Sequence, residues 1–356
     1  MSLPPERHEF ASDNTAAICP PAWAALAEAN AEGAASYGDD KWTRRVCQQV
    51  RDIFETDCEV FIVFNGTAAN ALALAQLCRS FHSVICHERA HVETDECGAP
   101  EFFGGGLKLL PTSGANGKLD LAQVEATLLR HCDVHSTKPR VISLTQATEV
   151  GTVYQPAEIE RIAEFARARS LLVHMDGARF ANAVAALGCA PKAITWEAGI
   201  DTLAFGGTKN GMAAGELVVF FKKELAQEFD YRAKQAGQLA SKMRFLAAPW
   251  SGLLSDGAWL ENARRANGCA KILAEKLTAV LGIEPAFTRE ANAVFVRLPE
   301  QIFSQLRARG WQFYKFIEPD VYRLMCSWSV TESDIDEFIA DVKMCGDGTR
   351  SVRGAQ

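Results

Sequence analysis

Short runs of apolar residues recur along the N-terminal and central parts of the chain. Most of them lack the polar residue at every second position that marks a half-exposed strand. They are also too short for buried helices, so they predict strands buried on both faces. Segments with apolar residues at helical spacing separate most of these runs. The predicted strands cover residues 59–64, 83–86, 107–110, 141–144, 171–175, 202–205 and 216–221.

The helices predicted between these strands have recognisable ends. "PPAWAALAEANAEG" (residues 20–33) begins with proline and ends with glycine, as helices commonly do. Asp40, in the polar stretch "YGDD", is placed to cap the helix that follows it. Helical patterns also cover residues 119–131, 156–170 and 179–188. The alternation of strands and helices predicts an α/β fold with a mainly parallel sheet covered on both faces.

The pattern changes after residue 221. Long helical stretches are predicted over residues 222–246 and 255–280. A strand "NAVFVRL", a helix, a strand "VYRLMC" and a last helix from Thr331 follow them. This order predicts a small C-terminal α/β unit. We therefore expect a large domain over residues 1–245 and a small one over residues 246–356.

Composition and charge exclude several classes of partner. The net charge of −7 and the pI near 5.6 argue against nucleic acid and anionic membranes. No apolar run is long enough to span a bilayer, and "MSLPPERHEF" lacks the apolar core of a secretory signal. Eleven cysteines are scattered without a C-x-x-C pair or metal-ligand spacing. We therefore expect a cytoplasmic protein with reduced thiols, no metal site and no membrane contact.

The stretch "NGTAAN" (residues 65–70) lies where a predicted strand passes into a helix. Gly66 permits a close approach of the backbone, and the N–H groups of Thr67 and Ala68 would point out of the helix start, where a phosphate can bind. The spacing is neither the G-x-G-x-x-G of a dinucleotide site nor that of a P-loop. The alternative is an ordinary helix cap with a glycine turn.

Two further residues suit one cofactor. Lys209 lies in "FGGTKNG", where flanking glycines would let a flat ligand lie against the backbone while the amine forms a Schiff base. Asp176 ends a buried strand in "LLVHMDGARFANA", where it could receive a pyridinium N–H. The alternatives are a solvated loop lysine and a helix cap. A phosphate cradle, a carboxylate and a lysine together fit the phosphate, ring nitrogen and aldehyde of pyridoxal 5'-phosphate.

"NGTAAN", "HMDGARFANA" and "GGTKNG" together resemble the threonine aldolase group of pyridoxal-phosphate enzymes. "LTQATEVGTVY" and "SKMRFLAAPW" are most similar to its bacterial low-specificity L-threonine and L-phenylserine aldolase branch. The resemblance implies fold type I, as in aspartate aminotransferase, with a seven-stranded, mainly parallel sheet in the large domain. It also implies a homotetramer, a dimer of dimers with active sites at the dimer interface.

The resemblance also implies roles for the cofactor site. Lys209 would hold the cofactor as a Schiff base, and Asp176 would pair with its pyridine nitrogen. His91, in "RAHVETDE", would stack on the ring and assist proton transfer, although a histidine there could instead be a capping or surface residue. The phosphate would bind Gly66, Thr67 and Ala68.

The substrate would be bound mainly by arginines. Arg179, which also belongs to the cofactor site, and Arg323 would grip the substrate carboxylate, with Ser12 nearby, because a guanidinium meets a carboxylate with two hydrogen bonds. For Arg323, a structural ion pair is the alternative. Tyr37 and residues 232–244 would reach a neighbouring subunit's cofactor. Glu149 stands where other threonine aldolases often carry a histidine, and it is either a base toward the β-hydroxyl group or an ion-pair partner.

The implied reaction is the cleavage of L-3-hydroxy-α-amino acids to glycine and an aldehyde. L-phenylserine, L-threonine and L-allo-threonine are the expected substrates. Other pyridoxal-phosphate chemistry, β-elimination or transamination, remains an alternative. A non-catalytic pyridoxal-phosphate-binding regulatory module is another, although no basic segment is left over for a DNA-reading domain. The missing G-x-G-x-x-G pattern disfavours a nicotinamide dehydrogenase.

Overall fold

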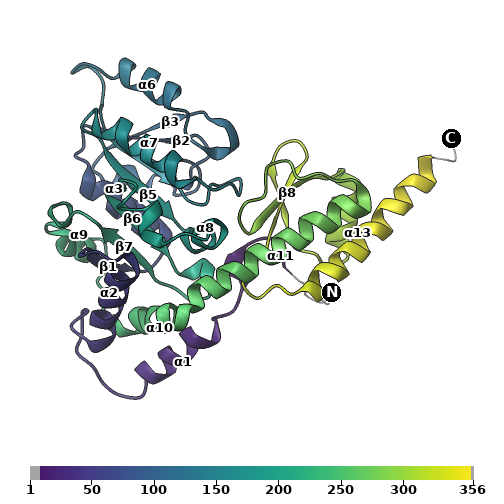
Figure 1. Ribbon diagram of the computed structural model, residues 1–356, viewed down its shortest axis with the longest axis horizontal. Coiled ribbons are helices and arrows are strands. Elements are labelled where there is room, and N and C mark those ends of the chain that lie inside the picture. The colour runs from purple at the N-terminus through teal and green to yellow at the C-terminus, as the bar shows by residue number, and fades with distance from the viewer. Residues whose placement is uncertain (1–8, 354–356) are drawn as a thin grey trace.

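The chain forms two α/β bodies joined by the long helix α11 (Ala258–Leu281) (Figure 1). The structure is a computed structural model that describes residues 9–353. In Figure 1, α11 runs from the larger body, beside α10 (Arg244–Leu254), to the smaller body that contains β8 (Ala293–Arg297). This arrangement leaves a boundary between the bodies where residues of both can meet.

The larger body is built on a seven-stranded sheet in the order β1-β7-β6-β5-β4-β2-β3. Strand β7 is antiparallel to both of its neighbours, and the other neighbouring strands are parallel. All seven strands predicted in this region are confirmed, as is the fold class. The strands are β1 (Glu59–Val63), β2 (His82–His87), β3 (Lys108–Thr112), β4 (Lys138–Thr145), β5 (Leu172–Gly177), β6 (Thr202–Gly206) and β7 (Glu216–Phe220).

Helices cover both faces of this sheet because alternate side chains of each strand enter different cores. In β7, Leu217 and Val219 join the core under α2, α6, α7, α8 and α10, whereas Val218 and Phe220 join the core under α3 and α9. The remaining helices of this body are α1 (Pro20–Ala29), α2 (Lys41–Phe54), α3 (Gly66–Leu77), α4 (His91–Thr94), α5 (Ala99–Phe103), α6 (Leu121–Arg130), α7 (Pro156–Arg167), α8 (Phe180–Leu187) and α9 (Phe229–Gln235). Asp40 caps α2 by accepting a hydrogen bond of 2.9 Å from the Thr43 amide.

The smaller body is a three-stranded antiparallel sheet packed on helices. Its strand order is β8-β10-β9, with β9 at Tyr314–Ile317 and β10 at Val321–Met325. Helices α12 (Glu300–Ala308), α13 (Glu332–Arg353) and α11 complete it. The N-terminal segment also packs here: the Phe10 amide donates to Gln312 O at 2.9 Å, and the Met325 amide donates to Phe10 O at 2.8 Å.

The helix predicted over residues 222–246 is wrong. The structure has a 3-10 turn at Lys223–Ala226, then α9, then a loop before α10. Glu228 at φ 60° and Gly237 at φ 74° adopt left-handed backbone angles that end a right-handed helix. Strand β9 is an element that the sequence pattern did not predict. The domain boundary after residue 245 stays a prediction; in the structure α10 packs into the core of the larger body.

Candidate active site

The predicted cofactor residues gather at one edge of the large sheet. Strands β1, β5 and β6 run in the same direction, so their carboxyl ends lie at the same edge. Helix α3 starts after β1, Asp176 ends β5, and Lys209 lies in a 3-10 turn (Thr208–Asn210) after β6. The strand order therefore brings together three motifs that are far apart in the sequence.

A cavity of about 430 Å³ lies at this edge, between the two bodies. The site residues that the sequence predicted and the structure brings to its wall are Ser12, His91, Glu149, Arg179, Lys209 and Arg323. The structure adds five lining residues that the sequence did not single out: Asn14, Asp95, Tyr314, Lys315 and Phe316. Three of these five lie on β9, which explains why the pattern of the sequence gave no sign of them.

The turn that carries Lys209 is held by a buried carboxyl group. Glu216 accepts hydrogen bonds from the amides of Gly207 at 2.6 Å and Thr208 at 3.4 Å. Burial raises the pKa of Glu216 to about 7, although the donors from Thr208 and Gly207 and the nearby Lys209 lower it. A Cβ atom at Gly207 would lie 2.5 Å from the Trp250 ring, so only glycine fits there. The backbone from which the Lys209 side chain extends is therefore fixed by contacts on several sides.

Asp176 lies on the face of the sheet that α3 covers, and it is buried. Its Oδ1 accepts a hydrogen bond of 2.9 Å from the Ala178 amide, and its Oδ2 accepts one of 3.0 Å from Asn70 Nδ2. The same Nδ2 donates to Glu96 Oε1 at 2.8 Å. Asn70 belongs to the "NGTAAN" motif but received no role from the sequence. The sequence does contain a sign of such a role, because Asn70 is a polar residue in the apolar middle of a helix.

His91 is paired with Glu96. Its Nδ1 lies 2.8 Å from Glu96 Oε1. This hydrogen bond raises the pKa of His91; burial opposes the rise, and the charges of Asp176 and Glu149 add to it. The other ring nitrogen, Nε2, has no hydrogen-bond partner within the described residues, so it is available to a bound molecule.

Arg179 forms a bidentate ion pair that the sequence did not predict. Its Nε and Nη2 donate to the two carboxylate oxygens of Asp13, at 2.7 and 3.0 Å. Burial disfavours the charge of Arg179, but the carboxylates of Asp13 and Glu149 outweigh it and raise its pKa. The motif "SDN" (residues 12–14) was the available signal for Asp13. The ion pair fixes the guanidinium in place at the wall of the cavity.

Arg323 has unused hydrogen-bonding capacity. Its Nη2 donates to Ala11 O at 3.1 Å and also contacts the Tyr314 hydroxyl group. Its Nε is buried without a partner in the described residues. Burial and the nearby charge of Arg179 lower the pKa of Arg323. Two guanidinium groups that share a cavity, one with an orphaned donor, form a site for an anion.

The start of α3 offers two free amides. Asn65 caps the helix, and its Oδ1 accepts a hydrogen bond of 2.9 Å from the Ala68 amide. The amides of Gly66 and Thr67 have no acceptor within the described residues. A Cβ atom at Gly66 would meet nothing within 4 Å, so the space before the helix is open. This arrangement fits a phosphate at the helix dipole, with the Ala68 amide already engaged by the cap.

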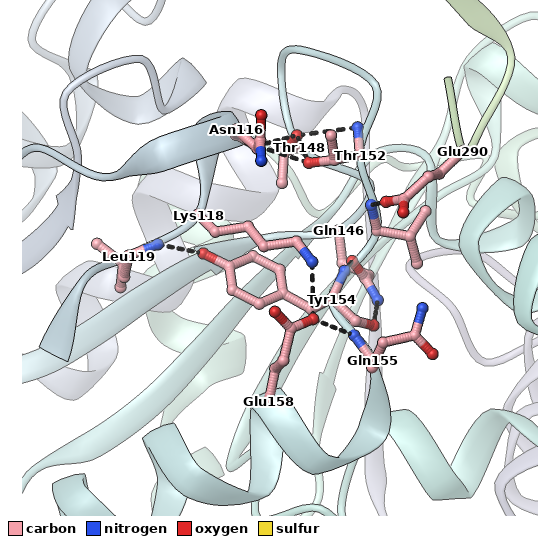
Figure 2. A network of polar contacts seen from close by, with 11 residues as sticks. Asn116, Lys118, Leu119, Gln146, Thr148, Thr152, Tyr154, Gln155, Glu158 and Glu290 are labelled. Carbon is pink, nitrogen blue, oxygen red and sulfur yellow. Dashed lines mark hydrogen bonds and ion pairs between the residues drawn. The ribbon is translucent and has the colours of Figure 1, made fainter. Parts of the chain in front are cut away.

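Glu149 lies in a tight turn between Thr148 and Thr152, and Figure 2 shows the polar contacts that hold these two threonines. The Thr148 amide donates to Thr152 O at 2.9 Å, and the hydroxyl groups of Thr148 and Thr152 lie 2.8 Å apart. The Thr152 hydroxyl group donates to Asn116 O at 2.6 Å. These bonds restrict the turn and so fix the direction in which Glu149 leaves the backbone.

Side chains on both flanks extend this bracing (Figure 2). The Gln146 carboxamide accepts from the Tyr154 amide and donates to the Tyr154 carbonyl group, both at 2.9 Å. The Tyr154 hydroxyl group accepts from the Leu119 amide at 2.7 Å. From the segment before β8, Glu290 Oε2 accepts from the Val153 amide at 2.6 Å. The turn that bears Glu149 is thus bonded to the smaller body.

Tyr37 is not at this cavity. It lies beside Asp230, Tyr231, Lys234 and Leu239, around a separate hollow on the surface, and the Lys234 ammonium lies 4.5 Å from the centre of its ring. Within one chain, Tyr37 and the residues of α9 are therefore apart from Lys209.

Within residues 9–353, no group of three or more His, Cys, Asp or Glu side chains is arranged to hold a metal ion. None of the helices described there combines the length and apolar character that crossing a bilayer requires.

Comparison with known proteins gives consistent matches. The model of a family described as Beta-eliminating lyase matches residues 9–301. A low specificity L-threonine aldolase from Pseudomonas sp. (strain NCIMB 10558) is 55% identical over 95% of this chain and 98% of its own length. A second low specificity L-threonine aldolase, from Pseudomonas aeruginosa, is 57% identical over 94% of this chain and 97% of its own length. The structure of a Leishmania major threonine aldolase superposes with a TM-score of 0.90 at 27% identity, covering 95% of this chain and 99% of that one.

Proposed function

This chain belongs to the Beta-eliminating lyase family, and from that membership and its threonine aldolase relatives we propose how its cavity acts. The enzyme is a carbon–carbon lyase that cleaves 3-hydroxy-α-amino acids to glycine and an aldehyde. The observation that carries the proposal is the cavity itself. Its lining includes Lys209, the arginines Arg179 and Arg323, and the candidate bases His91 and Glu149, which supports the proposal.

The cofactor is pyridoxal 5'-phosphate, and the residues present fit it. Lys209 would hold its aldehyde carbon, Asp176 its ring nitrogen, and the free amides of Gly66 and Thr67 its phosphate. When bound, it supplies an aldehyde that takes up amines covalently and a protonated ring that accepts electron density from the substrate Cα. The buried side chain of Asp176 would favour the protonated ring nitrogen, because an opposite charge stabilises the charged form.

We assign the substrate carboxylate to Arg179 and Arg323, with Ser12 beside them. The orphaned Nε of Arg323 supports this assignment. Because the Asp13 ion pair immobilises Arg179, the substrate is held with little freedom, and such orientation can lower a barrier by several kcal/mol, on the order of the effects of proximity in bound reactants.

Either His91 or Glu149 takes the proton of the substrate β-hydroxyl group, after which the Cα–Cβ bond breaks and the aldehyde leaves. A proton returned to Cα gives glycine. Both side chains reach the cavity, and both are held: His91 by Glu96 and Glu149 by its braced turn. His91→Gln and Glu149→Gln separate the two, because the acidic limb of the pH profile of kcat/KM disappears only with the true base.

The substrate side chain is proposed to lie against Tyr314 and Phe316, which are the aromatic residues of the cavity wall. An aromatic surface favours L-phenylserine, whereas L-threonine and L-allo-threonine leave part of it uncovered. Comparison of kcat/KM for the three substrates measures this preference.

We also propose a cytoplasmic homotetramer, a dimer of dimers with the active site at the dimer interface. Exposed aromatic side chains on α5, α9 and neighbouring loops support the assembly: Tyr37, Phe64, Phe102, Phe103 and Tyr231. Monomeric proteins rarely expose so many large apolar groups together. In such a dimer, Tyr37 and the 232–244 segment would face the partner's cavity. The exposed, unbridged thiols of Cys97 and Cys132 suit a reducing compartment.

The decisive experiment is a product assay of purified enzyme. We expect glycine and an aldehyde in equal amounts; a keto acid would instead indicate transamination or β-elimination. Lys209→Ala is expected to abolish cleavage, while Lys41→Ala, at an exposed ion pair with Glu32, serves as the control. If the Lys209 variant cleaves L-threonine at the wild-type rate, the assignment is wrong.

A further inference from the structure

Asn70 is a buried polar residue whose purpose the sequence does not reveal. It lies in the middle of α3, among alanine and leucine side chains, and only 2% of it is exposed. Its Nδ2 lies 2.8 Å from Glu96 Oε1 and 3.0 Å from Asp176 Oδ2. A carboxamide nitrogen carries two N–H groups, so Asn70 commits both of them to carboxylates from different segments of the chain.

The two carboxylates are an unfavourable pair without such a donor. Glu96 is 3% exposed and Asp176 is 2% exposed. Burial disfavours each charge, and two like charges within reach of one nitrogen repel each other. Burial raises the pKa of Glu96, and the hydrogen bonds with His91 and Asn70 hold it down. The second oxygen of Glu96 is buried without a partner in the described residues.

We propose that Asn70 is a positioning residue that holds the side chains of Glu96 and Asp176 side by side. One buried amide thereby orients both the carboxylate that pairs with His91 and the one offered to the cofactor's ring nitrogen. The inference rests on the proposed function for the role of Asp176, but the geometry of the four side chains is independent of it. Asn70 touches neither substrate nor reacting atoms, and it acts through its two carboxylate partners.

The charged groups that face His91 determine how the loss of Asn70 changes its titration. Glu96 hydrogen-bonds to the ring, Asp176 and Glu149 add negative charge, and Lys209 opposes them. Without the amide, Glu96 loses a hydrogen bond that lowers its pKa, so it takes up a proton more readily. His91 then loses its anionic partner for part of the time, and Asp176 loses a hydrogen bond that orients it toward the ring nitrogen.

The first test follows His91 in the full chain without cofactor. Histidine-selective isotope labelling and NMR give its titration, with His91→Gln to assign the resonance. In Asn70→Ala, we expect the pKa of His91 to fall toward the ordinary histidine value, with proton affinity about tenfold weaker. Asn182→Ala is the matched control: Asn182 is also a buried helical asparagine, and it donates to Asn267 Oδ1 at 3.0 Å. This control should leave the titration of His91 unchanged.

The second test measures the dissociation constant of pyridoxal phosphate against pH by equilibrium dialysis. Both Asn70→Ala and Asn70→Asp should bind about tenfold more weakly near pH 8, with fewer protons taken up on binding, because the free site of each variant already holds a proton. The aspartate has the shape of asparagine, so it keeps α3 packed if alanine does not. Wild-type titration of His91 and wild-type pH dependence of binding in both variants would overturn the proposal. If the wild-type chain binds no pyridoxal phosphate, the proposed function fails, while the titration of His91 still tests Asn70.

Discussion

At the scale of single residues, Glu216 shows how one buried carboxyl group can hold the turn that carries Lys209, the proposed cofactor lysine. It is 6% exposed and accepts the amides of Gly207 and Thr208, and the described residues place no cation in hydrogen-bond contact with it. Its pKa, about 7, is therefore higher in the folded protein than the ordinary 4.5 of a glutamate in the unfolded chain. The folded state binds this proton more tightly.

We predict a pH dependence of stability that Glu216→Gln removes. Because the pKa is raised on folding, the contribution of Glu216 to the free energy of unfolding is fully present below about pH 4.5, falls as the pH rises to about 7, and is constant above that. The loss across this window is on the order of 3 kcal/mol. Urea unfolding at several pH values measures it. If the free energy of unfolding changes with pH equally in the wild type and the glutamine variant, Glu216 does not titrate in this range.

Arg323 gives a second prediction at this scale. Arg323→Lys loses the planar fork and the free Nε, and it keeps the charge. We expect KM for L-threonine to rise roughly tenfold to a hundredfold, since a charge-assisted hydrogen bond contributes about 1.5–3 kcal/mol. Arg297→Lys on neighbouring β8, which pairs with Asp320 at the surface, is the control. Unchanged KM would place the substrate carboxylate elsewhere.

At the scale of elements, the strands were predictable and several of the connections were not. Buried parallel strands are apolar throughout, so their sequences identify them without knowledge of their neighbours. The segment 222–246 looked continuously helical because composition carries little information about a left-handed residue such as Glu228. Strand β9 pairs only with β10, at the edge of a small sheet, and its short sequence "YKFI" has no distinctive pattern.

The turn that bears Glu149 is the element for which we predict long-range support. Glu290→Ala removes the acceptor of the Val153 amide and so weakens the link between the turn and the smaller body. The bonds from the amides of residues 290 and 291 to Gly151 O, both at 3.1 Å, remain. We expect kcat/KM to fall about tenfold, corresponding to a loss of about 1.5 kcal/mol for a hydrogen bond to a charged group. In Glu290→Gln, which retains an acceptor, kcat/KM should fall less.

Glu284→Ala, at an exposed position in the segment before β8, is the control for this prediction. Thermal unfolding of all three variants separates loss of stability from loss of function. A Glu290→Ala variant with reduced stability but wild-type kcat/KM would show that Glu149 keeps its position without this bond.

At the scale of the whole molecule, the exposed aromatic side chains provide a test of the assembly that we propose. Phe102 is 79% exposed and Tyr231 is 74% exposed, and their helices both pack on α3, whose start faces the proposed phosphate. Phe102→Asp combined with Tyr231→Glu should dissociate the assembly, because burying a charge in an apolar interface is unfavourable. Light scattering after gel filtration measures the mass.

Leu129→Asp, at an exposed apolar residue on α6, is the matched control and should leave the mass unchanged. We expect the double variant to lose pyridoxal phosphate more readily if a partner completes the site. A wild-type protein that is monomeric and fully active would contradict the assembly.

The sequence alone determined the strands of the large sheet and their alternation with helices, and it singled out the lysine and the aspartate that we propose for the cofactor. Each of these depends on residues close together in the chain. Only the tertiary structure decided the partners of these groups. Asp13 pairs with Arg179, which lies 166 positions later in the sequence, and Asn70 hydrogen-bonds to Asp176, which lies 106 positions later. The local pattern of apolar and polar residues indicates whether a residue is buried. The partner of a buried charge is instead fixed by the order of strands and the packing of helices. The loop between α9 and α10 and the short edge strand β9 therefore emerged only from the fold.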